Sequence, residues 1–279
     1  MKNFVLFFIC AALLAASVVA QGPAEPKASI FIDKAVFDAS IKNVPCESDA
    51  RLDGVKKLFL AAGAAEADIR VEKLDKDKIS NVVVEKKGET DETVVIGAHY
   101  DRTDSGCGVT DNWTGVAIIA HIYQTLRPLS TKKSYIFVAF DKEEIGLRGS
   151  SQMLKAMTQE QTDKICSMVN FDSFGQGQPM ALKNASTSKM LKLAENLGKE
   201  ARFKFQSVEI PGASSDSASF RDKKIPAITL SGLDGNWTNI LHSSADNVSS
   251  VNIDSVYFGY RFGLMYLSKI DNGGCRDFR

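Results

Sequence analysis

The feature that most constrains the fold of this chain is a series of short apolar segments, separated by stretches in which apolar residues recur at helical spacing. The apolar segments predict buried strands, and the helical spacing predicts helices between them. Such alternation is typical of an α/β sandwich with a largely parallel sheet that is covered on both faces. We expect strands over 82–84, 93–98, 134–140, 168–171 and 225–230, and helices over 47–62, 115–126, 149–157, 187–201 and 251–270.

The charge balance disfavours a nucleic-acid partner. The chain of 279 residues carries 34 Lys and Arg and 34 Asp and Glu, so its formal net charge is zero. Nucleic-acid binding normally needs a basic excess, because neutralisation of phosphates dominates the affinity. The hydrophobic fraction of 44% is instead that of a globular protein, and the length is sufficient for a real buried core.

The first twenty residues predict a secretory signal peptide, 1–20. Lys2 supplies the positive charge, 4–16 the apolar stretch, and 18–20 the small residues of a cleavage site. A membrane anchor is the alternative, but a spanning helix needs about 20 apolar residues, slightly more than this run provides. We therefore expect a secreted, extracellular protein that has no contact with the membrane after the signal is removed.

After this signal, the composition predicts a short mobile segment, 21–29, and then one domain, 30–279, because no linker-like stretch divides it. Four cysteines remain in the mature chain, and an even number in a secreted protein predicts two disulfides, with three pairings open. The chain also holds glycosylation motifs at Asn184, Asn236 and Asn247. The four cysteines are Cys46, Cys107, Cys166 and Cys275.

Imidazole and carboxylate side chains follow directly after several of the expected strands. In open α/β sheets, ligands bind at the carboxyl ends of the strands. Mixed imidazole and carboxylate ligands suit zinc and similar divalent metals. The gaps between the candidates are too long for a local chelate, so they predict a site assembled across neighbouring strands. The candidates are His99, Asp111, Glu144, Asp172 and His242.

Five short segments carry a resemblance to a known family, and they occur in the family's order. With them the chain resembles the di-zinc, or co-catalytic, metalloaminopeptidases of the bacterial leucyl aminopeptidase type, which are related to glutaminyl cyclases. The resemblance implies the zinc exopeptidase fold, a three-layer sandwich with a mixed, mostly parallel central sheet and helices on both faces. The segments are 96–101 (IGAHYD), 110–117 (TDNWTGVA), 140–150 (FDKEEIGLRGS), 170–172 (NFD) and 242–246 (HSSAD).

The resemblance also implies two zinc ions per chain and a ligand for each position. Asp111 would bridge both ions. His99 and Asp172 would complete one site, and Glu144 and His242 would complete the other. Asn112 belongs to a fourth glycosylation motif, and we expect it to be buried beside the metal.

The implied reaction is hydrolysis of the N-terminal residue from peptide substrates by a metal-bridging hydroxide. Glu143 would be the general base that carries the proton from the attacking water to the leaving amine. Asp101 is also predicted as a catalytic residue. It would contact the His99 ring on the side away from the metal and orient it. Asp246 would do the same for His242.

Two residues depart from the patterns of the related families. Ser217 stands where the family often has His, and Leu241 stands where glutaminyl cyclases typically have Trp. A single-zinc glutaminyl-peptide cyclotransferase is an alternative on the same fold, although Leu241 and Ser217 depart from the cyclase pattern. A noncatalytic receptor-like relative is a further alternative, although such proteins usually lose ligands that this chain retains. A carboxypeptidase relative is another, because one well-placed arginine can bind a C-terminal carboxylate, and Arg102 or Arg148 could serve.

Overall fold

The computed structural model describes residues 30–76 and 78–279. The predicted signal peptide, 1–20, and the predicted mobile segment, 21–29, lie outside the described residues. One unit of the fold spans Phe31–Arg279. Among the described residues, no helix combines the length and the apolar character that crossing a membrane requires.

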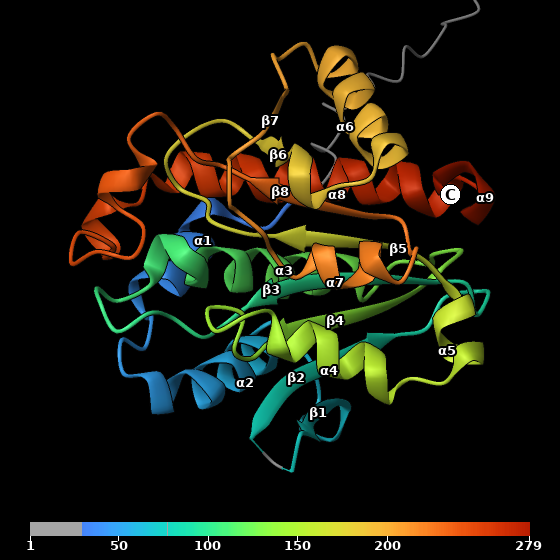
Figure 1. Cartoon of the computed structure of the whole chain (residues 1–279), viewed down its shortest axis with the longest axis horizontal. Coiled ribbons are helices and arrows are strands. Elements are labelled where there is room, and N and C mark those ends of the chain that lie inside the picture. The colour runs from blue at the N-terminus through green and yellow to red at the C-terminus, as the bar shows by residue number, and fades with distance from the viewer. Residues whose placement is uncertain (1–29, 77) are drawn as a thin grey trace, which may run out of the picture. The chain divides into compact units, whose positions relative to one another are not determined.

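Eight strands of the described residues form one mixed sheet (Figure 1). Their bounds are β1 (Ile69–Leu74), β2 (Ile79–Lys86), β3 (Thr93–His99), β4 (Ser134–Phe140), β5 (Ile165–Phe171), β6 (Met180–Leu182), β7 (Gln206–Val208) and β8 (Ala227–Ser231). The strand order is β1-β2-β4-β3-β5-β8-β6-β7. The four central strands β4, β3, β5 and β8 run parallel, whereas β2 and β6 pair antiparallel with their central neighbours.

This architecture confirms the predicted α/β sandwich with a mixed sheet that is parallel at its centre. Each strand expected from the sequence is present, and β2 and β5 extend beyond the expected bounds. Strands β1, β6 and β7 lie toward the edges of the sheet and were not expected. In β1, the alternation of Ile69 and Val71 with charged neighbours ends at Lys73, and the strand is only partly buried, so its apolar signal is weak.

Helices cover both faces of the sheet, as expected. Helices α1, α2, α3, α6 and α8 pack together on one face, and α4 and α7 pack on the other, in front of the strands in Figure 1. The bounds are α1 (Lys34–Lys42), α2 (Arg51–Ala61), α3 (Thr114–Leu126), α4 (Arg148–Ala156), α5 (Gln159–Asp163), α6 (Ser188–Glu200), α7 (Ser217–Asp222), α8 (Ile253–Asn272) and α9 (Cys275–Phe278).

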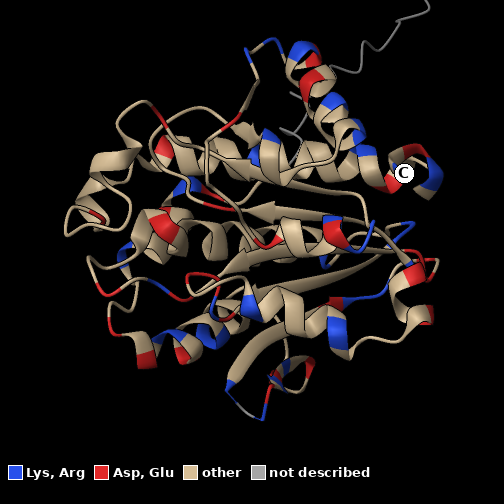
Figure 2. Cartoon of the chain, in the orientation of Figure 1, with Lys and Arg blue, Asp and Glu red and all other residues tan. Residues whose placement is uncertain are grey.

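Successive residues of the central strands point into two separate cores. In β3, Val94 and Ile96 pack with the α3 and α8 side, whereas Val95 packs with the α4 and α7 side. All three are fully buried. A strand that is buried on both faces must be apolar throughout, which explains the continuous apolar runs in the sequence. Charged residues lie mainly on the helices and loops around these strands (Figure 2).

Two disulfides confirm the number expected from the cysteine count. One joins Cys46 to Cys107, and the other joins Cys166 to Cys275. The first links the segment before α2 to the loop after β3. The second links β5 to the start of α9.

The register of the parallel strands brings their carboxyl ends to one edge of the sheet. His99, the last residue of β3, is opposite Phe140, the last residue of β4. Gly97 of β3 pairs with Asn170 near the end of β5. The loops that begin at Asp141 and Asp172 therefore start beside His99, and the chain comes together there as the sequence predicts.

Candidate metal centre

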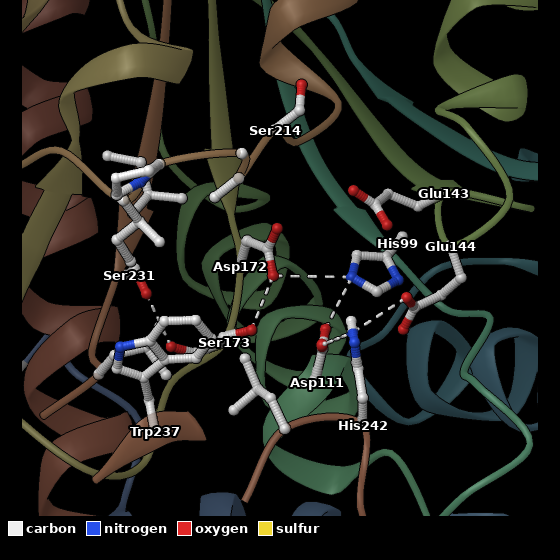
Figure 3. Close-up of a pocket in the computed structure, with 17 residues that line it drawn as sticks. His99, Asp111, Glu143, Glu144, Asp172, Ser173, Ser214, Ser231, Trp237 and His242 are labelled. Carbon is white, nitrogen blue, oxygen red and sulfur yellow. Dashed lines mark hydrogen bonds and ion pairs between the residues drawn. The ribbon is translucent and has the colours of Figure 1, made fainter. Parts of the chain in front are cut away.

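Asp111 lies between the two histidines that the sequence singles out (Figure 3). Its Oδ1 is 3.1 Å from Nε2 of His99, and its Oδ2 is 3.0 Å from Nε2 of His242. The same nitrogen of each histidine also lies near a second carboxylate. Nε2 of His99 is 3.6 Å from Oδ1 of Asp172, and Nε2 of His242 is 3.2 Å from Oε2 of Glu144.

These side chains form two groups of three that share Asp111. In each group, one donor atom per residue lies within 4.8 Å of the others. The inner group consists of His99, Asp111 and Asp172, all buried, and the outer group consists of Asp111, Glu144 and His242. The two groups differ in exposure, because the side chain of His99 is 1% exposed and that of His242 is 58% exposed. The structure thus brings together all five predicted ligands.

The Asp111 carboxylate is presented by an irregular turn, Val109–Trp113, that leads from β3 into α3. Gly108 enters this turn with a φ of 60°, which favours glycine. Asp246 holds the turn from outside. Its carboxylate accepts hydrogen bonds from the backbone amides of Val109 (2.9 Å), Thr110 (2.7 Å) and Asp111 (3.0 Å).

These bonds place Asp246 differently from the sequence expectation. Among the described residues, no hydrogen bond or ion pair joins Asp246 to His242. Three backbone donors occupy its two oxygens, so its contact with the site runs through the backbone of Asp111. The role predicted for Asp246 toward His242 stays a prediction.

Asp101 connects His99 to the two adjacent glutamates. Its Oδ1 is 3.4 Å from Nδ1 of His99, the ring nitrogen that faces away from Asp111. Its two oxygens also accept hydrogen bonds from the backbone amides of Glu143 (3.0 Å) and Glu144 (3.1 Å). One carboxylate therefore fixes the position of the loop after β4 relative to the end of β3.

Asp172 is oriented by serines that the sequence analysis did not single out. The hydroxyl of Ser215 donates to its Oδ2 at 2.5 Å, and that of Ser173 donates to its Oδ1 at 2.9 Å. Ser215 directly precedes Asp216. Both belong to the stretch in which the family often has His at the position that Ser217 occupies here. Ser217 itself donates to the carbonyl of Ala185 at 2.6 Å and is fully buried, so it belongs to the framework around the site.

Burial and mutual repulsion shape the proton affinities of the carboxylates. Burial raises the pKa of Glu143 well above its ordinary range, and it raises that of Glu144 to about 7, with Asp111 adding to the effect. Burial also raises the pKa of Asp216 to about 7.

Asp111 is the exception, because hydrogen bonds from His242 and His99 outweigh burial and hold its pKa below the ordinary range. The hydrogen bond to Asp111 raises the pKa of His242 to about 9.

The donor set fits zinc. Imidazole nitrogens and carboxylate oxygens are its usual ligands, and each group offers three of them, which leaves a position open for water or substrate. Oε1 of Glu144 is buried and has no hydrogen-bond partner in the described part of the chain. No Lys or Arg is among the described residues that line the cavity, so histidines are the only basic side chains in its described lining. Divalent cations would supply both the charge and the missing partners.

A cavity of about 420 Å³ opens onto these groups. Glu143 and Glu144 form part of its metal-facing wall beside His99 (Figure 3). The opposite wall is mainly apolar and comes from the end of β6 and from the loops before α7 and after β8. It includes Leu182, Ile210, Leu233, Trp237 and Leu241. A cavity that joins a charged wall to an apolar wall can hold a polar group and an apolar side chain of one ligand.

The sequence profile of peptidase family M28 matches residues 81–257, the part of the chain that contains every candidate ligand. Among curated proteins, a probable leucine aminopeptidase 2 from Aspergillus oryzae is 31% identical over 123 residues, or 43% of this chain and 25% of that protein. The chain thus spans about a quarter of the length of the curated relatives it matches.

Solved structures share the fold at low sequence identity. A zinc aminopeptidase from Bacillus subtilis superposes with a TM-score of 0.63 at 17% identity, over 72% of this chain and 54% of that chain. A glutaminyl cyclase from an Acidobacteriales bacterium superposes with a TM-score of 0.73 at 17% identity, over 91% of this chain and 99% of that chain. At such identities the likeness concerns the fold alone.

Proposed function

Because this chain belongs to peptidase family M28, we propose that it is a zinc aminopeptidase that holds two ions and removes the N-terminal residue from peptides. The observation that carries the proposal is Asp111, whose two oxygens face the histidines of two separate ligand groups. A shared carboxylate of this kind is what a pair of metal ions requires.

In this proposal, His99 and Asp172 would hold one ion, Glu144 and His242 would hold the other, and Asp111 would contribute to both. When bound, zinc polarises a carbonyl oxygen and lowers the pKa of water. Asp101 orients the His99 ring through its outer nitrogen, at 3.4 Å. Ser215 fixes Asp172 in the same way, so the ligands are positioned before any ion arrives.

Glu143 is the proton carrier in the proposed reaction. Its side chain lines the cavity, and its backbone is fixed by Asp101. It takes the proton from the attacking water and delivers it to the nitrogen of the scissile amide as that bond breaks. Glu144, its neighbour, points to His242, so the two adjacent glutamates take different roles.

The two walls of the cavity fit an N-terminal residue with an apolar side chain. The free α-amine of a peptide, which an internal peptide bond lacks, would bind in its neutral form beside the ions that the five ligands would hold. The apolar wall, with Leu233 and Trp237, would take the side chain of that residue. This combination favours release of residues such as leucine over charged residues.

The positions of two arginines speak against the carboxypeptidase alternative. Arg148 pairs with Asp75 at 2.6 Å, and Arg102 donates to the backbone carbonyls of Thr103 and Gly106. Neither belongs to the lining of the cavity, and the described lining contains no other Lys or Arg. The described cavity wall therefore offers no arginine to bind a C-terminal carboxylate in two parallel hydrogen bonds.

A glutaminyl cyclase is the second candidate, favoured by the superposition over 99% of a solved cyclase. In the family resemblance, such enzymes use one zinc, whereas this chain presents two complete groups of ligands. Release of an N-terminal residue and formation of pyroglutamate from an N-terminal glutamine distinguish the two functions. The number of ions bound distinguishes them independently.

We also propose that residues 30–279 form a single catalytic domain and that 1–20 direct it out of the cell. Two disulfides, Cys46–Cys107 and Cys166–Cys275, support an oxidising compartment, because reduced thiols prevail in the cytosol. Detection of the mature protein in culture medium, beginning after residue 20, would test this proposal.

One experiment tests the proposed function. The purified protein is freed of metal with a chelator and titrated with zinc, while release of leucine from a leucyl anilide and pyroglutamate formation from a glutaminyl peptide are followed. We expect two bound ions, recovery of leucine release, and no activity on the same anilide with a blocked amine. One ion together with pyroglutamate formation would establish the cyclase, and full activity in chelator would reject both.

A further inference from the structure

Arg51 is a fully buried cation that the proposed reaction does not use. It is the first residue of α2, and its side chain is 0% exposed. No carboxylate in the described part of the chain forms an ion pair with it. Its guanidinium instead donates to four backbone carbonyls, those of Pro45, Tyr100, Cys107 and Gly108. A buried charge in such a setting is costly, so its partners indicate what it stabilises.

Three of these carbonyls belong to the segments that present the central ligands. Tyr100 directly follows His99, and its carbonyl accepts from Nε of Arg51. Cys107 and Gly108 lead into the turn that carries Asp111, and their carbonyls accept from Arg51 at 2.9 and 3.1 Å. One planar guanidinium therefore connects the end of β3 to the beginning of the Asp111 turn.

A negatively charged side chain, Asp246, also binds the backbone of this turn, whereas Arg51 is positively charged. The carboxylate of Asp246 binds the amide hydrogens of Val109, Thr110 and Asp111. The irregular turn cannot pair all of its own backbone groups as a helix or strand does, and buried backbone groups need partners. The cation binds carbonyls that enter the turn, and the anion binds the amides that follow.

One further contact fixes Arg51 itself. Its guanidinium lies over the ring of Trp113, at the end of the turn, with 5.3 Å to the ring centroid. Its contact with the carbonyl of Cys107 lies beside the Cys46–Cys107 disulfide. Burial lowers the pKa of Arg51 to about 10, so the group remains charged at neutral pH, within the attraction of Asp101, Asp246 and Asp111.

We propose that Arg51 is a positioning residue that sets the affinity of the centre for zinc, by fixing the two backbone segments that present His99 and Asp111. The inference rests on the proposed function. Arg51 touches neither the cavity nor a candidate ligand side chain, so its influence is transmitted through the backbone carbonyls. Groups that orient metal ligands typically change metal affinity about 10–100-fold when they are removed.

The test compares Arg51→Met and Arg51→Lys with a matched control, Lys133→Met. Lys133 is also a buried cation, 3% exposed, but it pairs with Glu92 at the opposite ends of the strands. The zinc dissociation constant is measured with a competing chelator, at a temperature where each variant is folded by circular dichroism. Values of kcat and KM are then measured at saturating zinc.

For Arg51→Met we expect zinc binding weaker by about 10–100-fold, a lower kcat and an unchanged KM, because the apolar wall stays intact. Arg51→Lys should give an intermediate affinity, since it retains the charge but has fewer donors in a different geometry. Lys133→Met should lower the unfolding temperature and leave both zinc affinity and kcat as in the unaltered protein.

An unchanged zinc affinity and kcat in a folded Arg51→Met protein would overturn the inference, even if its unfolding temperature fell as in the control. If Arg51→Met does not fold, an unchanged affinity in Arg51→Lys would overturn it equally. Zinc binding without peptidase activity in the unaltered protein would reject the proposed function, while the affinity comparison would still decide the role of Arg51. Absence of zinc binding in the unaltered protein would reject both.

Discussion

The two ends of the central strands differ in how they balance charge. At the amino ends, Lys133 pairs with Glu92 at 2.8 Å, and Lys164 pairs with Asp91 at 3.2 Å. At the carboxyl ends, the carboxylates of the metal centre face one another and two histidines, and the described cavity lining contains no Lys or Arg. The same strands thus carry a balanced edge and an edge with excess negative charge.

The two edges also differ in whether their buried carboxylate oxygens have hydrogen-bond partners. At the amino ends, Oδ1 of Asp271 accepts from the hydroxyl of Tyr135 and from the backbone amide of Lys133. At the carboxyl ends, Oε1 of Glu144 and both oxygens of Asp216 are buried without a hydrogen-bond partner in the described residues. The carboxyl edge thus keeps buried carboxylate oxygens that a bound cation would satisfy, and such unpartnered groups are typical of functional sites.

The largest effect on turnover should come from Glu143→Gln at the acidic edge. The amide cannot carry a proton, so we expect kcat to fall about 10²–10⁴-fold while two zinc ions remain bound. Steady-state kinetics and metal analysis on the same sample measure both. The matched change at the balanced edge, Glu92→Gln, should leave kcat unaltered. Retained turnover in Glu143→Gln would remove the proton-carrier role.

A smaller loss is expected for Asp101→Asn. The amide can still accept one backbone hydrogen bond but loses the charge behind His99, at 3.4 Å. We expect metal affinity or kcat to fall about 10–100-fold. Competition with a chelating dye gives the affinity. If Asp101→Asn bound zinc and turned over like the unaltered protein, the contrast between the edges would rest on the ligands alone.

Trp237→Ala tests the apolar wall of the cavity rather than the acidic edge. Loss of this ring should reduce kcat/KM for a leucyl substrate about tenfold, mostly through KM, because apolar contacts in a pocket contribute about 1–3 kcal/mol. Zinc affinity should not change. Kinetics on leucyl and alanyl anilides separate the outcomes, since an equal loss for both would mean that this wall does not read the side chain.

The two disulfides permit the finest comparison, because each is at one edge. Replacing Cys166 and Cys275 with Ser should lower the free energy of unfolding by about 2–5 kcal/mol without changing kcat at a temperature where the protein is folded. Replacing Cys46 and Cys107 should have a similar effect on stability and should also lower kcat, because Cys107 precedes the Asp111 turn. Equal kcat in both double variants would contradict this distinction.

Much of the fold and the convergence of the candidate ligands could be predicted from the sequence. Fully apolar strands are a strong signal, and the residues that follow them must meet because parallel strands end at one edge. His99, Asp111 and Asp172 can be placed together on this basis and on the family resemblance. Strand β1, at the edge of the sheet, is partly exposed, so its apolar signal is diluted.

Arg51 and Asp246 show where sequence reasoning ends. Both bind backbone groups. Because nearly every residue carries the same backbone carbonyl and amide, the sequence does not show which of them a side chain binds. The sequence predicts Arg51 only as part of a helix, where arginine is usually exposed. Asp246 is expected beside His242, four positions away, but the irregular turn at 109–111 offers it three amide donors. Such partners become visible only in three dimensions.

The link between Asp246 and Asp111 spans 135 positions of the chain and has a consequence for protein synthesis. A ribosome releases the chain from its amino end at about 5–20 residues per second. While only the part before His242 has been made, the nascent chain has neither the anchor of the Asp111 turn nor the outer imidazole. The order of translation itself therefore leaves the candidate metal centre incomplete until the segment just before helix α8 has been made.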